Sequence, residues 1–552
     1  MINPGAKMDV IKTAEAHGYS REDGIWRSQR PSISIPEEET VDTVGMYYRM
    51  APDDDRLALV DVVSKEELTY KEFKIKFRTV ASGLHELGVR KGDVVMILSP
   101  NSVWFPVIIF GCWLVGATVT TVNPVNTSYE IEKQLKDSGA RLIFTVPEQY
   151  TKVQNFGKPV VLIGGTEQQH NVPKGATPFT KLLSADPRRV PEVTRRQSEI
   201  AALLYSSGTT GMSKGVVLTH RNIMAVILQL LYDAPPEVRD RRYMVMLPMY
   251  HVYGLAVVSI AQFFRPGALI IMPRFDTQLL LSSIEKYKIT DLPVVPPIII
   301  MLAKSKEVDR YDMSSLVEIT TGAAPCGLEL TMELHRRLPN VRIRQGFGMT
   351  ETSGIVGVNV SRPDNSHFGS TGTLVSNMEA KIIDVTTGKA LPPYDQGEIC
   401  VRGPNVMREY LNNPQATAST IKEGWLHTGD LGYYDETGQL HVVDRLKELI
   451  KYKGFQVAPA ELEALLLTHS KILDAAVVPL PDEKAGELPV AYVVKVANSK
   501  LTEQEVIAFA AEKVSPYKRL HKVTFIDAIP KSPSGKILRR ELTLLAKAKA
   551  KL

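Results

Sequence analysis

The stretch Tyr205-Ser206-Ser207-Gly208-Thr209-Thr210-Gly211-Met212-Ser213-Lys214-Gly215-Val216 decides how the rest of the chain is interpreted. It lies between two short apolar runs, 200–204 and 216–218, which are typical of buried strands. Glycines let successive backbone N–H groups converge on an anion, hydroxyls add donors, and a lysine adds positive charge. The pattern predicts a loop that holds phosphate groups. Its candidate ligands are Ser206, Ser207, Gly208, Thr209, Thr210 and Lys214.

This loop is not a Walker A loop, because Ser213 stands where that motif requires its second glycine. A plain turn rich in glycine, serine and threonine is the alternative interpretation. The flanking strands and the terminal lysine argue against a plain turn.

The composition is that of a soluble globular protein with more than one domain. The chain has 552 residues, 44% of them hydrophobic and 23% charged. Its net charge is only +5 and no basic block occurs, which argues against a nucleic-acid partner. The three cysteines are far apart without a CxxC pair, so neither a disulfide framework nor structural zinc is expected.

One stretch, 104–122, is uncharged and about long enough to cross a membrane. Pro106, Gly111 and Gly116 interrupt it, and its β-branched end is followed by Asn123-Pro124. We therefore expect a buried helix followed by a buried strand, and no membrane span. The N-terminus lacks the apolar core of a secretory signal.

Helical and strand patterns alternate from residue 69 onward, which predicts parallel α/β layers. Thr69 and Glu72 form a capping-box pattern at the start of one helix, and further helices are expected at 128–138 and from Pro459. Residues 1–45 are polar and contain prolines, and we expect them to form an extended or wrapping segment. Residues 164–196 are also polar and are expected to form an irregular surface connection. Short strands separated by turns follow residue 360. The fold class is therefore α/β, with a large multi-layer N-terminal domain (1–445) that includes a β-rich subdomain, and a small α+β C-terminal domain (446–552).

Four further motifs carry chemically useful residues. Gln345-Gly346-Phe347-Gly348-Met349-Thr350-Glu351 combines glycines that allow close approach of a ring with an acid that can hold a metal. Trp425-Leu426-His427-Thr428-Gly429-Asp430 places an acid after a glycine turn, where it can accept from a diol. The run 444–454 is rich in charge, and 530–537 is a loop that ends in Lys536. Each motif alone is compatible with an ordinary turn or a solvated face.

Together and in this order, the motifs resemble the adenylate-forming superfamily of acyl-CoA synthetases, adenylation domains and luciferases. The resemblance extends over residues 45–540 and is strongest to the plant 4-coumarate–CoA ligases and their peroxisomal ligase-like relatives. It implies an ATP-dependent carboxylic acid–CoA ligase. A carboxylate attacks the α-phosphorus of Mg²⁺-bound ATP to give an acyl-adenylate and pyrophosphate, and the thiol of coenzyme A then gives the thioester and AMP.

The resemblance also implies roles for individual residues. The small C-terminal domain would rotate between the two steps about a hinge at 444–447, so that two lysine loops serve one site in turn. The implied catalytic residues are Lys536, Lys451, Lys447 and His251. The implied ATP ligands are the phosphate-loop residues above with Gln345, Gly346, Phe347, Thr350, Asp430, Arg445 and Lys536. The acyl group would contact Tyr253, Val257, Ala323, Gly348, Lys447 and Lys451. Coenzyme A would contact Arg274, Lys453 and Gly454, and Glu351 would hold Mg²⁺.

The acyl pocket departs from the hydroxycinnamate pattern. His251-Val252-Tyr253-Gly254-Leu255-Ala256-Val257 has apolar residues where those ligases commonly carry polar ones, and Thr320 stands where a lysine is common. We therefore expect an apolar pocket in which cinnamate-like or medium-to-long aliphatic acids compete with 4-coumarate. For His251 we favour a lining role over proton transfer.

The final tripeptide Ala550-Lys551-Leu552 is similar to a peroxisomal address, which predicts import by a peroxisomal receptor, with the cytoplasm as the alternative. Two other functions stay open at this point. The enzyme could pass its acyl group to a carrier protein, or it could be an inactive binding relative. The charges at Lys453 and Arg274 favour coenzyme A over a carrier protein, and the presence of Glu351, Asp430 and Lys536 argues against inactivity.

Overall fold

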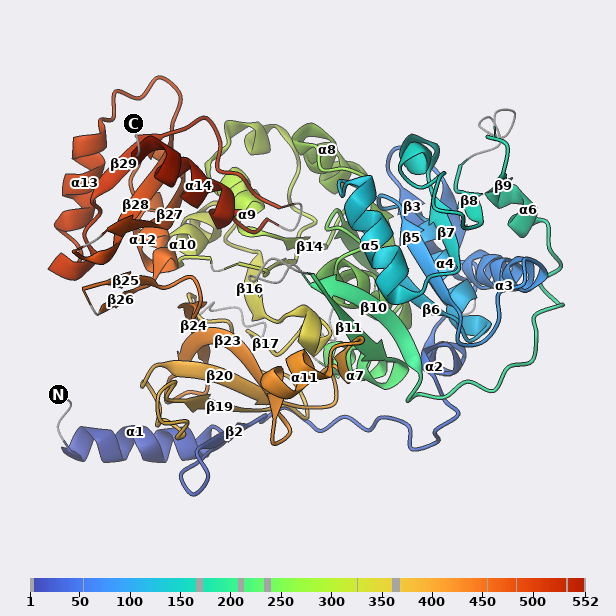
Figure 1. The fold of residues 1–552 in the computed structure, drawn as a ribbon, viewed down its shortest axis with the longest axis horizontal. Helices are drawn as coiled ribbons and strands as arrows, with labels where there is room; N and C mark the ends of the chain where they lie inside the picture. The colour runs from blue at the N-terminus through green and yellow to red at the C-terminus, as the bar shows by residue number, and fades with distance from the viewer. Residues whose placement is uncertain are drawn as a thin grey trace.

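The computed structural model describes residues 4–52, 54–164, 172–206, 213–232, 240–324, 326–359, 368–453, 455–482, 484–532 and 535–550. Four β-sheets organise these residues, and two of them are large and mostly parallel (Figure 1). Among the described residues, no helix is both long and apolar enough to cross a membrane.

The first large sheet carries the phosphate loop at the junction of β10 and β11. Strands β10, β6, β5, β7, β8 and β9 run parallel, whereas β11 returns antiparallel to β10 and places Ser206 opposite Lys214. The strands predicted at 200–204 and 216–218 are confirmed as β10 and β11, with ends within two residues. In spatial order the strands are β21 (Glu409–Tyr410), β11 (Lys214–Thr219), β10 (Ile200–Ser206), β6 (Thr118–Thr121), β5 (Val94–Leu98), β7 (Leu142–Thr145), β8 (Val160–Leu162) and β9 (Ala176–Pro178).

The second large sheet contributes four neighbouring parallel strands, β16, β15, β14 and β12, to the centre of the molecule. Its order is β18 (Thr373–Leu374), β17 (Gly357–Val358), β16 (Arg342–Phe347), β15 (Glu318–Thr321), β14 (Asp291–Val294), β12 (Arg241–Val245), β13 (Gly267–Ile271), β3 (Leu57–Asp61) and β4 (Glu67–Thr69). Because the carboxyl ends of parallel strands meet at one edge, the loops after β14, β15 and β16 come together.

Helices cover these sheets. One of them, α4, accounts for most of the uncharged stretch at 104–122. Residues 105–114 of α4 are all buried, so this helix is apolar on every side because it is enclosed by protein. The predicted capping box of α3 is confirmed, since Thr69 and Glu72 exchange backbone and side-chain hydrogen bonds. The helices are α2 (Thr43–Met50), α3 (Tyr70–Glu86), α4 (Trp104–Leu114), α5 (Ser128–Ser138), η1 (Pro147–Lys152), α6 (Phe179–Leu183), α7 (His220–Tyr232), η3 (Tyr253–Ser259), η4 (Ile260–Phe264), α8 (Thr277–Tyr287), α9 (Pro296–Lys304), η5 (Lys306–Arg310), α10 (Leu328–Arg337) and η6 (Thr350–Thr352).

The third sheet is the predicted β-rich subdomain, and it includes the N-terminal segment. The expectation that residues 1–45 are extended is wrong for the helix α1 (Pro4–Ala16). Two short strands follow this helix, and Trp26 stacks on Tyr434 at a centroid distance of 4.9 Å. This buried aromatic pair anchors a segment that is otherwise largely polar. The strands are β1 (Tyr19–Ser20), β2 (Ile25–Arg27), β19 (Glu379–Ile383), β20 (Gly397–Arg402), β23 (Trp425–Tyr434), β22 (Ile421–Lys422) and β24 (Leu440–Arg445), with α11 (Pro414–Thr420) beside them.

The segment 164–196 is likewise not wholly irregular. It contains β9 and α6, and Phe179 packs edge-on against Trp104 at 5.3 Å. Burial of this one aromatic side chain fixes a helix too short for a periodic pattern to reveal.

The C-terminal residues form a fourth sheet with hydrophobic cores of their own. This unit lies at one end of the molecule beside α9 and α10 (Figure 1). Pro459 begins a helix, as predicted. The elements are β25 (Ile450–Tyr452), β26 (Phe455–Val457), α12 (Pro459–Leu467), β27 (Ile472–Asp482), β28 (Gly486–Lys495), α13 (Glu503–Ala511), η7 (Pro516–Lys518), β29 (Lys522–Phe525) and α14 (Arg539–Ala550).

Candidate active site

A central cavity lies along β12, β14, β15 and β16 and reaches the loops at their carboxyl ends. Parallel sheets commonly bind ligands at this edge. Many of the lining residues fall into two groups. The loop end consists of His251, Ala323, Phe347, Thr350 and Lys536. The strand end consists of Arg241, Asp291, Glu318 and Arg344.

Lys536 enters the cavity from the C-terminal unit, although it is almost 300 residues from His251 in the sequence. Its loop is held by a bridge between Lys531 and Ile537 and by an ion pair of Lys531 with Asp474 at 2.5 Å. Burial lowers the pKa of Lys536, and Arg445 lowers it further, whereas the nearby carboxylates of Asp430 and Glu351 raise it. The lysine therefore lies among the groups expected to hold a nucleotide.

Asp430 and Arg445 are paired across two antiparallel strands. They face each other in the register of β23 and β24, with Arg445 Nε 3.4 Å from Asp430 Oδ1. Burial raises the pKa of Asp430 to about 6, against the opposing effects of Arg445 and Lys536. This pair is suited to a ribose, because a carboxylate accepts hydrogen bonds from a diol.

Glu351 is connected to the phosphate loop through a residue that sequence reasoning missed. Tyr410 donates a hydrogen bond of 2.7 Å to Glu351 Oε1, and Lys214 Nζ lies 4.7 Å from the centre of the Tyr410 ring. Tyr410 stands on β21, which pairs with β11 immediately after the loop. No motif surrounds Tyr410 in the sequence, so only this strand pairing reveals it.

The motif at 345–351 begins in the last residues of β16. Gly346, Phe347 and Gly348 line the cavity at the end of β16. Gln345 is buried, and its carbonyl accepts a hydrogen bond of 3.0 Å from Asn359 N–H. Ala323 lines the cavity with a φ of +68°, a strained conformation for alanine that occurs chiefly at functional sites.

His251, Tyr253 and Val257 lie together on the wall formed by η3. Burial lowers the pKa of His251 to about 4, and the charge of Lys536 acts in the same direction. The imidazole is therefore neutral near pH 7, which favours lining over a role as a cation.

Four residues implied by the resemblance lie elsewhere. Lys447, Lys451, Lys453 and Arg274 are exposed, and none is among the described residues that line the cavity. Lys453 has a φ of +48°, and its backbone N–H donates to Ala485 O at 2.8 Å. Ser207, Gly208, Thr209, Thr210 and Gly454 lie outside the described residues. Ser206 and Lys214 frame that gap at the ends of β10 and β11.

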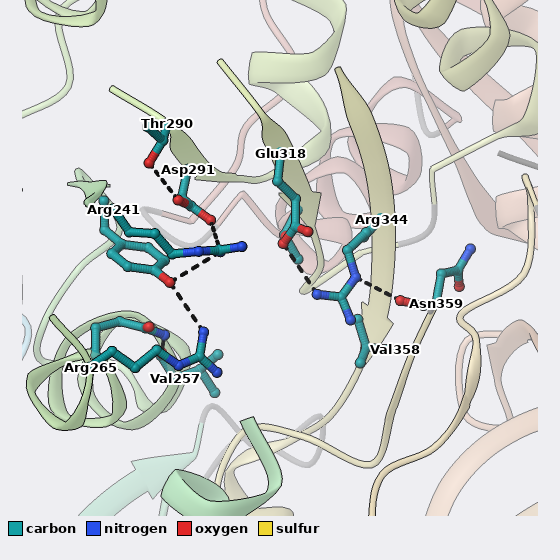
Figure 2. A network of polar contacts seen from close by, with 12 residues as sticks. Arg241, Val257, Arg265, Thr290, Asp291, Glu318, Arg344, Val358 and Asn359 are labelled. Atoms are coloured by element: carbon teal, nitrogen blue, oxygen red, sulfur yellow. Dashed lines mark hydrogen bonds and ion pairs between the residues drawn. The ribbon is translucent and has the colours of Figure 1, made fainter. Parts of the chain in front are cut away.

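The expectation of an apolar pocket holds near Val252 and Val257 but is wrong at the strand end. Arg241 forms an ion pair with Asp291 at 2.5 Å, and Arg344 forms one with Glu318 at 3.2 Å (Figure 2). Of the two apolar residues that replace polar ones in the family pattern, Val257 lines the cavity, whereas Ala256 is not among the described lining residues.

Sequence reasoning missed these charged residues because they stand inside strands and not in motifs. A signal did exist. Strands of a parallel sheet covered on both faces are usually uninterrupted apolar runs, so each charge within them requires a physical reason. The residues at alternate positions share one face of the sheet, and this face lines the cavity.

The fold is that of an adenylate-forming enzyme, in which a large N-terminal part and a smaller C-terminal part both line one cavity. Two family models match the chain: the AMP-binding enzyme model over residues 48–411 and the AMP-binding enzyme C-terminal domain model over 461–536. The chain belongs to the AMP-binding enzyme family.

Two curated relatives match nearly full length. The chain is 42% identical to 4-coumarate-CoA ligase 1 of Narcissus pseudonarcissus over 95% of this chain and 96% of that protein. It is 41% identical to peroxisomal OPC-8:0-CoA ligase 1 of Arabidopsis thaliana, over 97% and 98%. Among solved structures, ATP-bound MatB from Rhodopseudomonas palustris superposes with a TM-score of 0.82 at 27% identity, over 92% of this chain and 99% of that one. The chain is an AMP-forming acid–CoA ligase.

Proposed function

We propose that the loop end of the cavity carries out the adenylation half of this ligation, with Lys536 as the cation that joins the two substrates. The observation that carries the proposal is the position of Lys536. A buried lysine from the C-terminal unit lies in one cavity with Phe347 and Thr350, within electrostatic reach of Asp430, Arg445 and Glu351. Lys536 forms no ion pair with a carboxylate of the described residues, and burial of a lysine without such a partner is costly unless an anion is bound there.

The difficulty in the first step is repulsion between the acid's carboxylate and the triphosphate. Lys536 would contact both the carboxylate and the α-phosphate, and Thr350 would donate to the α-phosphate. The phosphate loop from Ser206 to Lys214 would hold the β- and γ-phosphates. Such positioned charges stabilise the charge that develops during phosphoryl-group chemistry. The carboxylate oxygen attacks the α-phosphorus, so both carbon–oxygen bonds of the acid are retained. Pyrophosphate leaves as the new oxygen–phosphorus bond forms.

Asp430 and Arg445 would hold the ribose, and Gln345, Gly346 and Phe347 would lie against the adenine. Both groups are close to Lys536, since Phe347 lines the same cavity and Asp430 contributes to the electrostatics of the lysine. This arrangement would place the α-phosphate beside the lysine.

Glu351 fits a Mg²⁺ site. Its carboxylate is 6% exposed, and the hydrogen bond that it accepts from Tyr410 leaves further oxygen lone pairs for a hard cation. When bound, Mg²⁺ would neutralise part of the charge of the phosphates. Tyr410 would orient the Glu351 carboxylate toward them.

For the thioester half, we propose that the C-terminal unit (446–552) turns relative to residues 1–445 about a hinge at 444–447. Lys451 and Lys447 would then reach the acyl-adenylate, and Arg274, Lys453 and Gly454 would contact coenzyme A. Their exposure supports this proposal, because these lysines have no place in the cavity while Lys536 occupies it. Asp444 links the two units through a hydrogen bond of 2.9 Å from Ala460 N–H.

The acid would be of the 4-coumarate, cinnamate or medium-to-long aliphatic class, in line with the names of the relatives. We place the protein in the peroxisome, in line with the Arabidopsis relative and the final Ala550-Lys551-Leu552, whose last two residues lie outside the described structure. An N-terminal fluorescent fusion tests this location. It should be punctate and colocalise with peroxisomes, and it should become diffuse when these three residues are deleted.

The test of the catalytic proposal separates the two halves. Acid-dependent exchange of pyrophosphate into ATP measures adenylation, and AMP release with added coenzyme A measures the whole reaction. Lys536→Met should abolish exchange, whereas Lys451→Met should retain exchange and lose thioester formation. Equal loss of exchange in both variants would refute the assignment of Lys536 to adenylation and Lys451 to thioester formation. Transfer of the acyl group to a carrier protein in the absence of coenzyme A would show that the acceptor is not coenzyme A.

A further inference from the structure

The strand end of the cavity is built from one face of four neighbouring strands. Tyr243 on β12 pairs with Asp291 on β14, Asp291 pairs with Glu318 on β15, and Thr320 pairs with Arg344 on β16. Residues two positions apart point to the same face. Polar side chains therefore gather near the amino ends of these strands, while Gly322 and Gly346 lie nearer the loop end.

These side chains carry an excess of positive charge. The charged groups that line this region among the described residues are three arginines (241, 265 and 344) and two acids (291 and 318), so the balance is 3 − 2 = +1. The Arg241–Asp291 and Arg344–Glu318 pairs are each less than 10% exposed. Arg265 donates to the Tyr243 hydroxyl at 3.2 Å and is not paired with an acid in the described structure. Figure 2 shows the Glu318 carboxylate between the guanidinium groups of Arg241 and Arg344.

One donor at this end lacks a partner. Arg241 uses Nη1 for both of its hydrogen bonds, to Asp291 and to Tyr243, and its buried Nη2 has no partner among the described residues. Leaving a buried donor of a charged group unsatisfied costs more than a typical hydrogen bond contributes. Arg241 lines the cavity together with Arg265 and Arg344, and a guanidinium in such surroundings is suited to a negatively charged oxygen acceptor.

From these observations we infer that the acid accepted by this enzyme carries a second carboxylate at its far end, which Arg241 Nη2 receives at the strand end. The inference rests on the proposed function, because it assumes that the first carboxylate reacts at Lys536. The distance along β15 between the strand end and the loop end of the cavity supports an aliphatic linker of medium length between the two carboxylates. Glu318 and Gly322 are four residues apart along β15 and the residue that follows it, which corresponds to about 13 Å at roughly 3.3 Å per residue.

The second carboxylate would also explain why the charges are retained. Replacing a buried ion pair by apolar residues is often neutral or stabilising, so a pocket for a purely apolar chain gains nothing from Arg241 and Asp291. A site built to hydrogen-bond a substrate group rejects analogues that lack the group, because its own donors are then left unpaired.

The experiment compares three matched acids on the full-length enzyme: octanoate, 8-hydroxyoctanoate and octanedioate. The corresponding twelve-carbon acids extend the comparison to a longer linker. Acid-dependent AMP formation with coenzyme A gives kcat/KM for each acid. We expect kcat/KM for the diacid of the better length to exceed that of its monoacid by at least about tenfold. Equal or higher kcat/KM for the monoacid, or a preference for the hydroxy acid, would overturn the inference.

Two variants locate the effect. Arg241→Met/Asp291→Leu removes both charges together, so that no buried carboxylate is left unpaired, and should cancel or invert the preference for the diacid. Arg242→Met is the matched control. Arg242 is the next residue of the same strand, it contacts Tyr287 O and Asp240, and it is not among the described lining residues. The control should keep the wild-type preference. An unchanged preference in the double variant would also overturn the assignment to Arg241.

Failure of this inference is distinguishable from failure of the proposed function. If monoacids are converted but diacids are not preferred, the ligase stands and the second-carboxylate site falls. If no acid supports pyrophosphate exchange or AMP formation, the proposed function falls, and the inference falls with it. The comparison among acids on the wild-type enzyme needs no variant, so a folding defect in the double variant does not leave the question open.

Discussion

The two ends of the central cavity are built in different ways. At the loop end, functional side chains come from segments far apart in the sequence, and most of them stand in glycine-rich loops at the ends of strands. At the strand end, the side chains stand inside regular strands and are fixed by sheet register. With the roles proposed above, the chemistry common to all acids and the choice between acids would be carried by separate parts of one cavity.

The largest expected effect comes from Lys536→Met, which removes the cation from the loop end. Loss of one positioned charge in a buried site typically costs about 10²- to 10³-fold in rate. We expect adenylation, measured by pyrophosphate exchange, to fall by about this factor for every acid. The ratio of rates between a diacid and its monoacid should stay the same. A change in that ratio would show that Lys536 also contributes to the choice between acids, so that the two ends do not act independently.

A smaller effect is expected from Gly535→Ala, which strains the loop that delivers Lys536. Gly535 has a φ of +81°, and a Cβ there would lie 2.9 Å from Val295 Cβ. A left-handed conformation costs an L-residue about 1–2 kcal/mol, which corresponds to a reduction of about 5- to 30-fold in adenylation. Thioester formation from supplied acyl-adenylate should be unchanged. Gly388→Ala is the control, because Gly388 has a φ of +71° with open space around its Cβ.

Asp430 should give the loop end a pH dependence. Its pKa is raised from 3.8 to about 6, with burial as the main cause and Arg445, Lys536, Glu448 and Glu351 as its charged neighbours. The ionised form that accepts from a ribose is present above pH 6 and is lost as the pH falls through 6. We expect kcat/KM for ATP to decrease with an apparent pKa near 6, by about tenfold at pH 5.

The matched variant for this pH dependence is Asp430→Asn. It should lower kcat/KM for ATP at pH 7.5 and flatten its decrease between pH 7 and pH 5. Burial also raises the pKa of Asp444 to about 6, so a profile that persists in Asp430→Asn would assign the titration to Asp444 or another group.

The smallest effect is expected from Tyr410→Phe. This change removes the 2.7 Å hydrogen bond to Glu351 without changing the shape of the ring over which Lys214 lies. A loss of about 1 kcal/mol, or about fivefold in adenylation rate, is expected equally for all acids. Tyr129→Phe, at an exposed tyrosine, should have no effect. A shift in acid preference by Tyr410→Phe would again show that the two ends are coupled.

The sequence could single out Phe347, Thr350 and Lys536, which line one cavity, because they occur in local motifs with unusual composition. The glycines and hydroxyls around Lys214, and the GxG turn before Glu351, form a combination that ordinary turns rarely carry. The strand end depends on register between strands that are up to about a hundred residues apart in the sequence, such as β12 and β16. No local pattern specifies that Arg241 meets Asp291 or that Arg344 meets Glu318.

The same limit accounts for the missed elements of the fold. The helix α1 and the short strands after it are anchored by Trp26 against Tyr434, a contact between residues about 400 positions apart. The capping box at Thr69, by contrast, lies within one turn of a helix. The prediction that a helix begins there is confirmed.

The alternation of side chains along β14, β15 and β16 has a consequence for how such enzymes diverge. Ile319 and Ile343 belong to the hydrophobic core, whereas their neighbours Glu318 and Arg344 face the cavity. We therefore expect a mutation at a cavity-facing position to alter which acid is bound, while the core residues beside it continue to hold the sheet together. After gene duplication, one copy would change its substrate without passing through an inactive intermediate, because Lys536 and Glu351 stay in place throughout.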